Sequence, residues 1–428
     1  MEKLKENITM QDLKNKNGLP LNLAYCNECN ISNQQPTTTN EYFHTKETVQ
    51  TTIEFDEKGV CSACKFNKLK WGQAIDWQQR EKELIDLCNK HRKNDGTHDC
   101  IVGGSGGKDS IFQSHLLKYK YKMNPLTVTW APHLYTKIGW QNYQNWLHVG
   151  GFDNYLYTPN PKIHKKITRE ATINLLHPFQ PFILGQKTFA VKMACRFNIP
   201  LIFYGEMPGE YGRKVSHKTN KFSFQDPDVV QKGYQLDPLG DKNFKDAFIG
   251  GKKISEYIEE GTPEVELQSY KPEDADVIKN KKIEFFYFGY YVKFVPQENF
   301  YFAVENANFS ANLERTEGTY SKYNSIDDKL DGFFYYTRFI KFGVGRAMMD
   351  SAQEIRNRHI EKDEGLALIS KFDGEYPQKY EQEFLNYISM SKEEFLELVD
   401  TFRPEHIWEK KSNNWILKKS PKDFFNKK

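Results

Sequence analysis

The sequence predicts an α/β protein with a doubly wound parallel sheet, and two observations support that fold class. Between residues 100 and 205, short apolar runs alternate with helical patterns at the spacing of strand–helix units. The first apolar run ends in a turn that holds four glycines, Gly103-Gly104-Ser105-Gly106-Gly107, and a helical pattern follows it. Ligands of such sheets bind beyond the carboxyl ends of the strands, so we expect Ser105, Trp130 and Glu206 to converge.

Length, charge and hydropathy exclude several classes of protein. With 428 residues the chain can form two or three domains, and its 60 basic and 57 acidic residues leave a net charge of +3. That balance gives no reason to expect a nucleic-acid partner. No apolar run reaches membrane-spanning length, so we expect no membrane insertion. Residues 1–22 lack the apolar core of a signal peptide, and an odd count of seven cysteines fits a reducing, cytoplasmic setting.

Four cysteines pair by their spacing into two Cys-x-x-Cys motifs, Cys26 with Cys29 and Cys61 with Cys64. Two such pairs in a segment poor in core residues are typical of a structural Cys₄ zinc site, whose binding energy replaces a hydrophobic core. The same four ligands would also suit an iron–sulfur cluster. A redox role is less favoured, because neither pair opens a helix after a buried strand. We therefore predict a zinc-binding N-terminal module over residues 1–71, with a strand-like stretch at 47–55.

The remaining elements of the sheet region follow in chain order. A charged amphipathic helix is predicted over 72–93, before the strand that begins at Cys100. Three further strands are predicted at 125–130, 154–157 and 200–205, and helices at 138–149, 162–176 and 186–197 lie between them.

Beyond residue 212 the composition changes. Residues 213–282 are rich in Lys, Asp and Gln and poor in apolar positions, which predicts an insertion or lid. Residues 283–294 form an aromatic, strand-like run. The pattern from 308 onward is helical, with one element at 340–357, more over 381–398, and a solvated tail from 418. The predicted division is a module at 1–71, an α/β domain at 72–300 that carries the insertion, and a mainly helical region at 301–428.

The glycine loop, residues 103–110, joins a predicted strand to a predicted helix, where free backbone N–H groups and the helix dipole favour an anion. Two better-known phosphate loops are excluded by spacing. A Walker A loop that uses Lys108 needs glycine where Val102 stands and a hydroxyl residue where Asp109 stands. A dinucleotide fingerprint that starts at Gly104 needs a small residue in place of Asp109. The alternative to an anion site is a glycine-rich structural turn.

The Ser-Gly-Gly-Lys-Asp-Ser segment at 105–110 resembles the pyrophosphate loop of ATP pyrophosphatases, enzymes that activate a substrate by adenylation. The resemblance implies a sheet of the adenine-nucleotide alpha-hydrolase type, ATP bound at the loop, and Mg²⁺ on the phosphates near Asp109. The expected ATP-binding residues are Gly104, Ser105, Gly106, Gly107, Lys108, Asp109, Ser110, Trp130 and Lys187.

Further stretches resemble one family, the N-acetyl sugar amidotransferases of bacterial surface-glycan biosynthesis. Beside the cysteine pairs and the glycine loop, they lie at 157–161, 178–182, 185–187, 204–206, 210–212, 314–323 and 341–347. The chain departs from the family at Met207-Pro208-Gly209, where an asparagine is expected directly after Glu206. The resemblance implies ATP-dependent conversion of a sugar acetamido group into an acetamidino group, with ammonia as nitrogen donor and AMP and pyrophosphate as products.

The resemblance also implies a separate glutaminase that supplies the ammonia. The chain itself shows no glutaminase signature, because it lacks an N-terminal cysteine nucleophile and a cysteine in a strand-to-helix elbow. The sequence does not name the sugar, which is either nucleotide-linked or a free nonulosonic acid. It leaves the oligomeric state open, a homo-oligomer included.

Individual site residues follow from the same pattern. Lys108 and Asp109 are candidate catalytic residues at the loop, and Glu206 and Glu210 are candidate bases for the adding nitrogen. The alternative for these glutamates is a helix N-terminal cap or a salt bridge to Arg213. Candidate substrate-binding residues are Arg315, Glu317 and Arg346, for which a structural ion pair is the alternative. Trp130 would stack on adenine or cap its strand, and Lys187 would face an anion at a helix start or be solvated.

Two other classes of function are alternatives to the amidotransferase interpretation. tRNA-modifying adenylating enzymes, such as thiolases and lysidine synthetases, use the same loop but need a basic face and usually a catalytic cysteine. Cys195 lies in a helical pattern instead of at a strand end, which disfavours that class. A non-enzymatic ATP sensor, with the cysteine pairs as a partner-binding module, would leave ATP intact.

Overall fold

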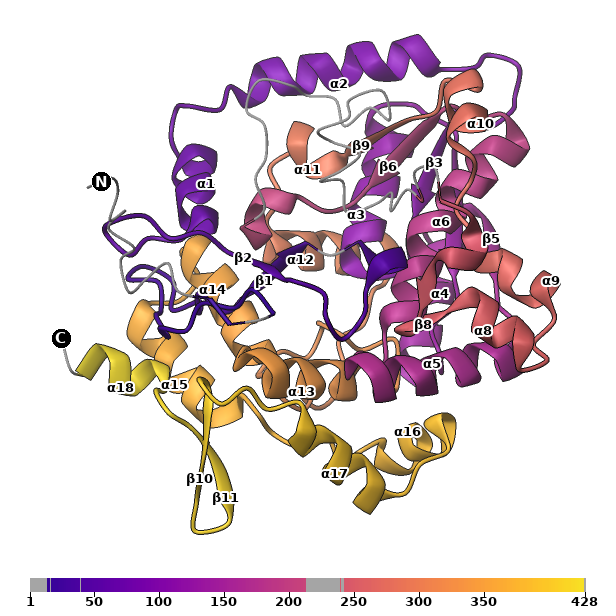
Figure 1. Ribbon diagram of the computed structural model, residues 1–428. Coiled ribbons are helices and arrows are strands. Elements are labelled where there is room, and N and C mark those ends of the chain that lie inside the picture. The colour runs from indigo at the N-terminus through magenta and orange to yellow at the C-terminus, as the bar shows by residue number, and fades with distance from the viewer. Residues whose placement is uncertain (1–13, 16, 39, 213–238, 240–241, 427–428) are drawn as a thin grey trace, which may run out of the picture.

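The computed structural model describes residues 14–15, 17–38, 40–212, 239 and 242–426. Its centre is the predicted parallel sheet, with five strands in the order β5–β4–β3–β6–β9 (Figure 1). The strands are β3 (Cys100–Gly103), β4 (Pro125–Trp130), β5 (Asp153–Tyr157), β6 (Leu201–Tyr204) and β9 (Glu284–Tyr287). The chain runs outward from β3 in one direction to β4 and β5, and in the other to β6 and β9. The end of β3 is therefore the point where strand order reverses, the usual place for a ligand.

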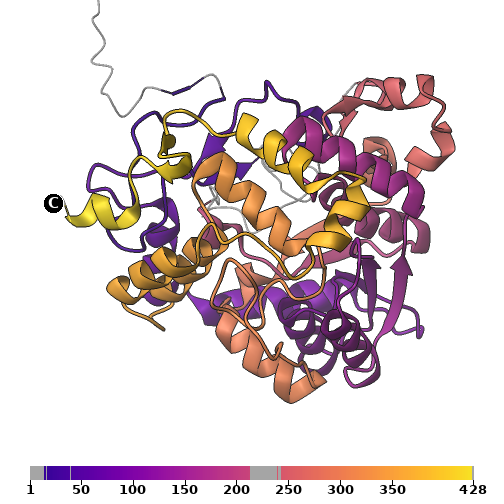
Figure 2. The ribbon, with the colours of Figure 1, turned by 90° about the horizontal axis from the view of Figure 1, so that it is seen from below.

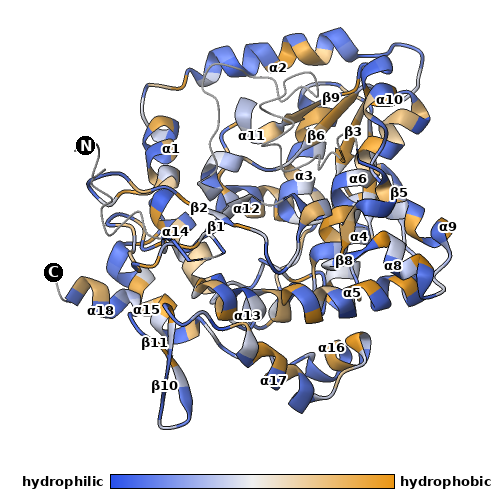
Figure 3. Ribbon diagram, in the orientation of Figure 1, coloured by the Kyte–Doolittle hydropathy of each residue, from blue (hydrophilic) through white to orange (hydrophobic). Residues whose placement is uncertain are grey.

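Helices cover both faces of the sheet. Ile101, Ile202 and Phe285 pack on the side of α5 (Pro161–Leu175) and α6 (Gln180–Phe197). Their neighbours in the strands, Val102 and Phe203, pack on the opposite side with α2 (Trp77–His91) and α11 (Phe288–Tyr291). Because both faces are buried, the central strands β3 and β6 are largely apolar, as Figure 3 shows.

The other elements extend this frame. Near the glycine loop lie α1 (Ser62–Trp71), α3 (Lys108–His115), a π-helical turn (Leu116–Lys120), α4 (Lys137–His148) and α12 (Pro296–Ala307). The C-terminal part contains α13 (Asp331–Phe342), α14 (Arg346–Arg356), α15 (Lys362–Phe372), α16 (Glu381–Ile388), α17 (Lys392–Thr401), the hairpin β10 (Trp408–Lys411) and β11 (Asn414–Leu417), and α18 (Pro421–Asn426).

Four predicted elements are shorter than expected or divided in two. The helix expected at 340–357 is two helices, because Gly343 takes a positive φ of 62° and ends α13, and the backbone N–H groups of Gly345 and Met348 donate to Asp373. The pattern at 381–398 breaks in the same way at Ser389, before a capping box at Ser391. The aromatic run at 283–294 is a strand only as far as Tyr287 and then turns into α11. The strand-like stretch at 47–55 reduces to β2 (Thr51–Thr52), which pairs with β1 (Pro36–Thr38).

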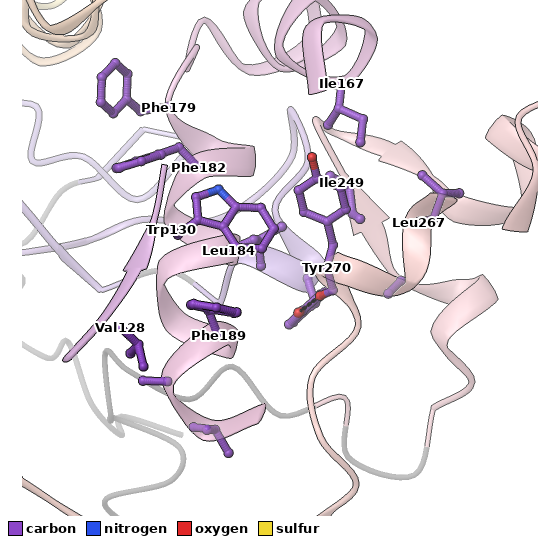
Figure 4. Close-up of a cluster of buried hydrophobic side chains, with 14 of the residues drawn as sticks. Val128, Trp130, Ile167, Phe179, Phe182, Leu184, Phe189, Ile249, Leu267 and Tyr270 are labelled. Atoms are coloured by element: carbon purple, nitrogen blue, oxygen red, sulfur yellow. Dashed lines mark hydrogen bonds between the residues drawn. The ribbon is translucent and has the colours of Figure 1, made fainter. Parts of the chain in front are cut away.

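The predicted insertion is not a detached lid where it is described. Residues 213–238 and 240–241 lie outside the described residues, but residues 242–282 pack into the main core. Tyr257 on α8 (Ile254–Glu259) is fully buried, and Ile249, Leu267 and Tyr270 join Trp130 and Phe189 in one cluster (Figure 4). Sequence reasoning missed this because the apolar residues are few and spread among many charges. The short elements of this segment are β7 (Phe248–Ile249), β8 (Lys252–Lys253), α9 (Glu264–Leu267) and α10 (Ala275–Asn280).

The C-terminal region is continuous with the sheet region. Helix α12 crosses the boundary expected at residue 300, and Phe333 of α13 belongs to the same core cluster as Ile101. The tail expected to be solvated contains α18, whose Phe424 ring meets Tyr25 edge to face at 5.5 Å. Figure 2 shows these C-terminal helices beside both the N-terminal segment and the helices of the sheet. Within the part of the chain that the structure describes, no helix is both long and apolar enough to cross a membrane.

Truncation of Tyr257 tests whether the 242–282 segment is core. Tyr257→Ala removes a fully buried ring and its hydroxyl bond to the carbonyl of Ile249. We expect it to lower the free energy of unfolding by about 3 kcal/mol, as for other large-to-small core changes. Val265→Ala, at a side chain in the same segment that is 75% exposed, is the matched control and should change little. Equally small effects of both variants in denaturant titrations would contradict core packing.

Candidate functional site

The glycine loop has the geometry of an anion site. Strand β3 ends at Gly103 and α3 begins at Lys108; its N-cap residue is Gly107, which offers no side chain to cap the helix. A Cβ on Gly104 would lie 2.3 Å from Cβ of Ser110, and one on Gly106, where φ is +81°, would lie 2.6 Å from the backbone of Tyr143. Both glycines are therefore sterically required, and the N–H groups at the start of α3 remain available to a phosphate.

The charged pair that follows the loop is held from a distant helix. Lys108 Nζ lies 2.8 Å from Oδ2 of Asp109, and Nδ2 of Asn299 on α12 donates to Oδ1 of Asp109 at 2.8 Å. Both side chains are partly buried at the helix start. Lys108 and Asp109 therefore both stay beside the glycine loop, and the bond from Asn299 fixes the Asp109 carboxylate.

The loop opens into a cavity with a volume of about 390 Å³, which is within the usual size range of small-molecule sites. We call it the larger cavity, to distinguish it from a smaller one beside it. One wall is the sheet side, with Trp130 at the end of β4 and Glu206 after β6, so these two residues converge with Ser105 as expected. The opposite wall is formed by residues that follow α12. The wall residues from that region are Phe309, Tyr323, Asn324, Ser325, Ile326, Asp327, Asp328, Asp331, Tyr335 and Arg346.

Three carboxyl groups on the opposite wall were not expected from the sequence. Asp328 accepts bonds from the backbone N–H of His133 at 2.7 Å and pairs with its Nδ1 at 2.8 Å. Asp327 interacts with the hydroxyl of Ser105 and with Asp331. Burial raises the pKa of Asp327, and the charge of Asp328 raises it further. Burial also raises the pKa of Asp331, to well above its usual range, and the charges of Asp327 and Asp328 add to this effect. Such a pair can hold a shared proton. The only sequence signal was three acidic residues within five positions.

Arg346 is the predicted substrate-binding residue that lies at this wall. Its Nε is 2.9 Å from Oδ1 of Asp350, its Nη1 donates to the hydroxyl of Tyr335, and its guanidinium lies over the Tyr335 ring. The position at the first residue of α14 follows from the helix break at Gly345. A guanidinium fixed in this way can present its remaining donors to a bound anion or sugar hydroxyl.

The other two predicted substrate-binding residues lie elsewhere. Arg315 makes a two-pronged ion pair with Glu375, with N–O distances of 2.6 and 2.7 Å, and Glu317 accepts the backbone N–H groups of Gln378 and Lys379. Neither lines the larger cavity. These contacts fit the structural alternative, in which both residues fasten their loop to the segment before α16.

Two of the residues expected to bind ATP, Lys187 and Trp130, lie in surroundings that differ from those expected. Helix α6 begins at Gln180, so Lys187 lies in mid-helix instead of at a helix start, and it is 2% exposed while lining the larger cavity. Trp130 also lines this cavity but is only 4% exposed. A Cβ on Gly185 would lie 2.0 Å from its ring, and Tyr157 and Phe189 pack on it (Figure 4). The ring therefore serves as a packed wall, without an open face for adenine.

Glu210 does not line the larger cavity. It is fully buried, with Oε1 2.6 Å from Nζ of Lys70 and Oε2 accepting from Nδ2 of Asn67 at 3.0 Å. Because both carboxylate oxygens are engaged, the geometry does not support the role of a base for the adding nitrogen. Arg213, the expected salt-bridge partner, lies outside the described residues; the ion pair that the structure shows for Glu210 is with Lys70. Glu206, by contrast, lines the larger cavity beside the loop.

The four paired cysteines form a single cluster. Their Sγ atoms lie within 4.8 Å of one another, and the pairs Cys26–Cys64 and Cys29–Cys61 are 3.8 and 3.6 Å apart. Tetrahedral Zn–S bonds of about 2.3 Å place sulfurs about 3.8 Å apart, so the donor set fits zinc. Backbone N–H groups of Cys61 and Cys64 donate to sulfurs at 3.3 and 3.4 Å, and Nη1 of Arg356 donates to Cys29, which stabilises thiolates.

Comparisons with known proteins cover parts of the chain. Residues 317–422 match the family model described as "LPS biosynthesis protein WbpG-like, C-terminal domain", a span that includes Asp327, Asp331 and Arg346. The uncharacterized protein MJ1599 of Methanocaldococcus jannaschii is 35% identical over 85 residues, which cover 20% of this chain and 29% of that protein. The chain thus spans less than a third of that relative. The NH3-dependent NAD synthetase of Campylobacter jejuni, solved with the nitrate ion, aligns over 20% of this chain and 37% of its own, at 20% identity and a TM-score of 0.17.

Loss of one cysteine tests the metal site. We expect one zinc per chain in the wild type, and we expect Cys61→Ser to lower zinc content and thermal stability together, because a three-thiolate site binds more weakly. Cys195→Ala, at a buried cysteine on α6 outside the cluster, is the control and should retain its zinc. Wild-type protein that is folded and metal-free by elemental analysis would overturn the assignment, and iron with sulfide would indicate a cluster instead.

Proposed function

We propose that the protein is an ATP-dependent, AMP-forming amidotransferase that converts an acetamido group of a bacterial sugar into an acetamidino group. The observation that carries the proposal is the glycine loop at the reversal point of the sheet, with the uncapped start of α3 facing the larger cavity. The match of residues 317–422 to a lipopolysaccharide-biosynthesis domain supports a sugar substrate, since that span forms the opposite wall.

The chemistry requires activation of a poor electrophile. An amide carbonyl has no leaving group, so its oxygen first forms a bond to the α-phosphorus of ATP while the bond to pyrophosphate breaks. Ammonia then forms the new C–N bond, the C–O bond breaks, and AMP departs with the former amide oxygen. The nitrogen loses one proton in this step, which leaves the neutral amidine or its protonated form. ATP supplies the leaving group and is consumed, so AMP and pyrophosphate are the products.

The loop residues would hold the phosphates. The start of α3, Ser105 and Lys108 all line the larger cavity, so their N–H groups, hydroxyl and ammonium group could stabilise charge on departing pyrophosphate. Asp109 offers a hard oxygen ligand beside them, so Mg²⁺, which neutralises phosphate charge when bound, fits this end of the cavity. The buried ammonium group of Lys187 lines the same cavity from α6 and adds positive charge.

The opposite wall suits a sugar. Carboxyl groups accept bonds from hydroxyls, Tyr323 and Tyr335 offer aromatic surface, and Arg346 offers a fixed cation. The carboxyl pair Asp327–Asp331 and Glu206 line the cavity in which the adding nitrogen must lose its proton, so they are the proton acceptors that this geometry offers.

Product analysis tests the reaction class. With ATP, Mg²⁺, ammonium chloride and a panel of nucleotide-linked and free N-acetyl sugars, we expect AMP and pyrophosphate in equal amounts, and an acetamidino sugar by mass spectrometry. Lys108→Ala should lower turnover about 100-fold or more with an unchanged thermal midpoint, since it removes charge stabilisation at the loop. Lys279→Ala, at an exposed lysine of α10, is the control. ADP as the stoichiometric product would contradict the proposal, and intact ATP would favour a sensor.

The source of nitrogen is a separate proposal. Free ammonia is largely protonated at neutral pH and then has no lone pair, so a partner that delivers neutral ammonia would raise the rate. We expect the purified chain to use ammonium salts but not glutamine, and to use glutamine once a glutaminase is added. Efficient glutamine-dependent amidination by the highly purified single chain would contradict this, and nitrogen-15 labelling of the amidino group would identify the donor.

A further inference from the structure

A smaller cavity of about 130 Å³ adjoins the larger one. Both are lined by Lys108, Asp109, Tyr211, Asn324 and Arg346, so these side chains form the partition between them. The rest of the smaller cavity is walled mainly by the cysteine module and by α14. The residues that line the smaller cavity but not the larger one include Ile31, Gln35, Ile53, Ala63, Gln353 and Arg356.

The charged groups that line the smaller cavity are paired. Lys108 pairs with Asp109 at 2.8 Å, Arg346 with Asp350 at 2.9 Å, and Glu210 with Lys70 at 2.6 Å. An ion that entered would lose its hydration and find no uncompensated counter-charge among these pairs. Arg356, the remaining charge, donates to the carbonyl oxygen of Glu210 and to Cys29 of the cysteine cluster. The cavity therefore favours a small neutral molecule over an ion.

Outside the partition, three buried polar atoms on its lining residues have no hydrogen-bond partner among the described residues. They are Oε1 of Gln35, which is an acceptor, and Nε2 of Gln353 and Nε of Arg356, which are donors. Gln35 is only 6% exposed, so its carbonyl oxygen has little access to bulk water. A cavity with orphaned donors and acceptors requires a guest that both donates and accepts hydrogen bonds. Water and ammonia both fit this volume and meet that requirement.

We propose that the smaller cavity is an antechamber that passes neutral ammonia into the larger cavity between Lys108, Tyr211 and Arg346. This inference rests on the proposed function. It assigns separate routes to the reactants, with ATP and sugar in the larger cavity and ammonia through the wall shared with the cysteine module. Because the charges around the cavity are paired, nothing there compensates an ammonium ion for its lost hydration, so the species that arrives has a free lone pair.

Filling the antechamber tests this route. Gln353→Phe adds bulk and removes one orphaned donor without touching the larger cavity's lining. We expect the KM for ammonium chloride to rise about tenfold, with the KM for ATP and the kcat at saturating ammonium within about twofold of wild type. Gln382→Phe, at an exposed glutamine of α16, is the matched control. In the wild type, the KM expressed as neutral ammonia should stay constant as pH rises, while the KM expressed as total ammonium falls.

The outcomes separate the two proposals. Zinc content and thermal midpoint report whether the Gln353→Phe protein is folded. If it is not, Gln353→Leu is the second variant, because it nearly keeps the side-chain size and removes the polar amide. We expect it to raise the KM for ammonium about threefold. An unchanged KM in a folded Gln353→Phe protein overturns the antechamber and leaves the reaction standing. Absence of AMP formation by the wild type overturns the proposed function, and the antechamber with it.

Discussion

The buried ion pair between Lys70 and Glu210 is the contact on which the arrangement of the site depends. Lys70, at the end of α1, also donates to the carbonyl of Phe294 and to the side chain of Asn357 after α14. One ammonium group thus joins the cysteine module, the loop after β6, the segment before α12 and the end of α14. Both side chains are at most 1% exposed, and removing one partner of such a pair costs about 3–5 kcal/mol. The pair therefore fixes several walls of the two cavities relative to one another.

The cysteine cluster is part of the same junction. Arg356 donates one nitrogen to Cys29 and another to the carbonyl oxygen of Glu210, so the thiolates and the loop after β6 are held by one guanidinium. Burial alone would lower the pKa of Arg356, but the charges of the facing thiolates raise it, so the guanidinium stays in its charged form. A metal in the cluster would stabilise the N-terminal module, and through Arg356 it would also hold Tyr211 in the partition between the cavities.

The larger cavity is assembled from two halves with different chemistry. The sheet half supplies backbone N–H groups, Lys108 and Lys187, which suit phosphate oxygens. The half contributed by residues 309–346 supplies carboxyl groups, aromatic rings and Arg346, which suit a polar organic substrate. The contact of Ser105 with Asp327 joins the two halves at the loop itself. The glycine loop at 103–110 and residues within the 317–422 domain match thus line the same cavity.

The sequence by itself determined the parallel strands, predicted to begin at Cys100 and to span 125–130, 154–157 and 200–205, together with the glycine loop and the cysteine pairs. Each is specified by neighbours within a few residues: alternation, steric need for glycine, or a fixed ligand spacing. Only the tertiary structure decided that Glu210 pairs with Lys70, that Arg315 pairs with Glu375, and that three aspartates after residue 326 face the loop. Charged side chains carry no periodic signal for their partners, and burial of such a group is decided by which distant segment supplies the opposite charge.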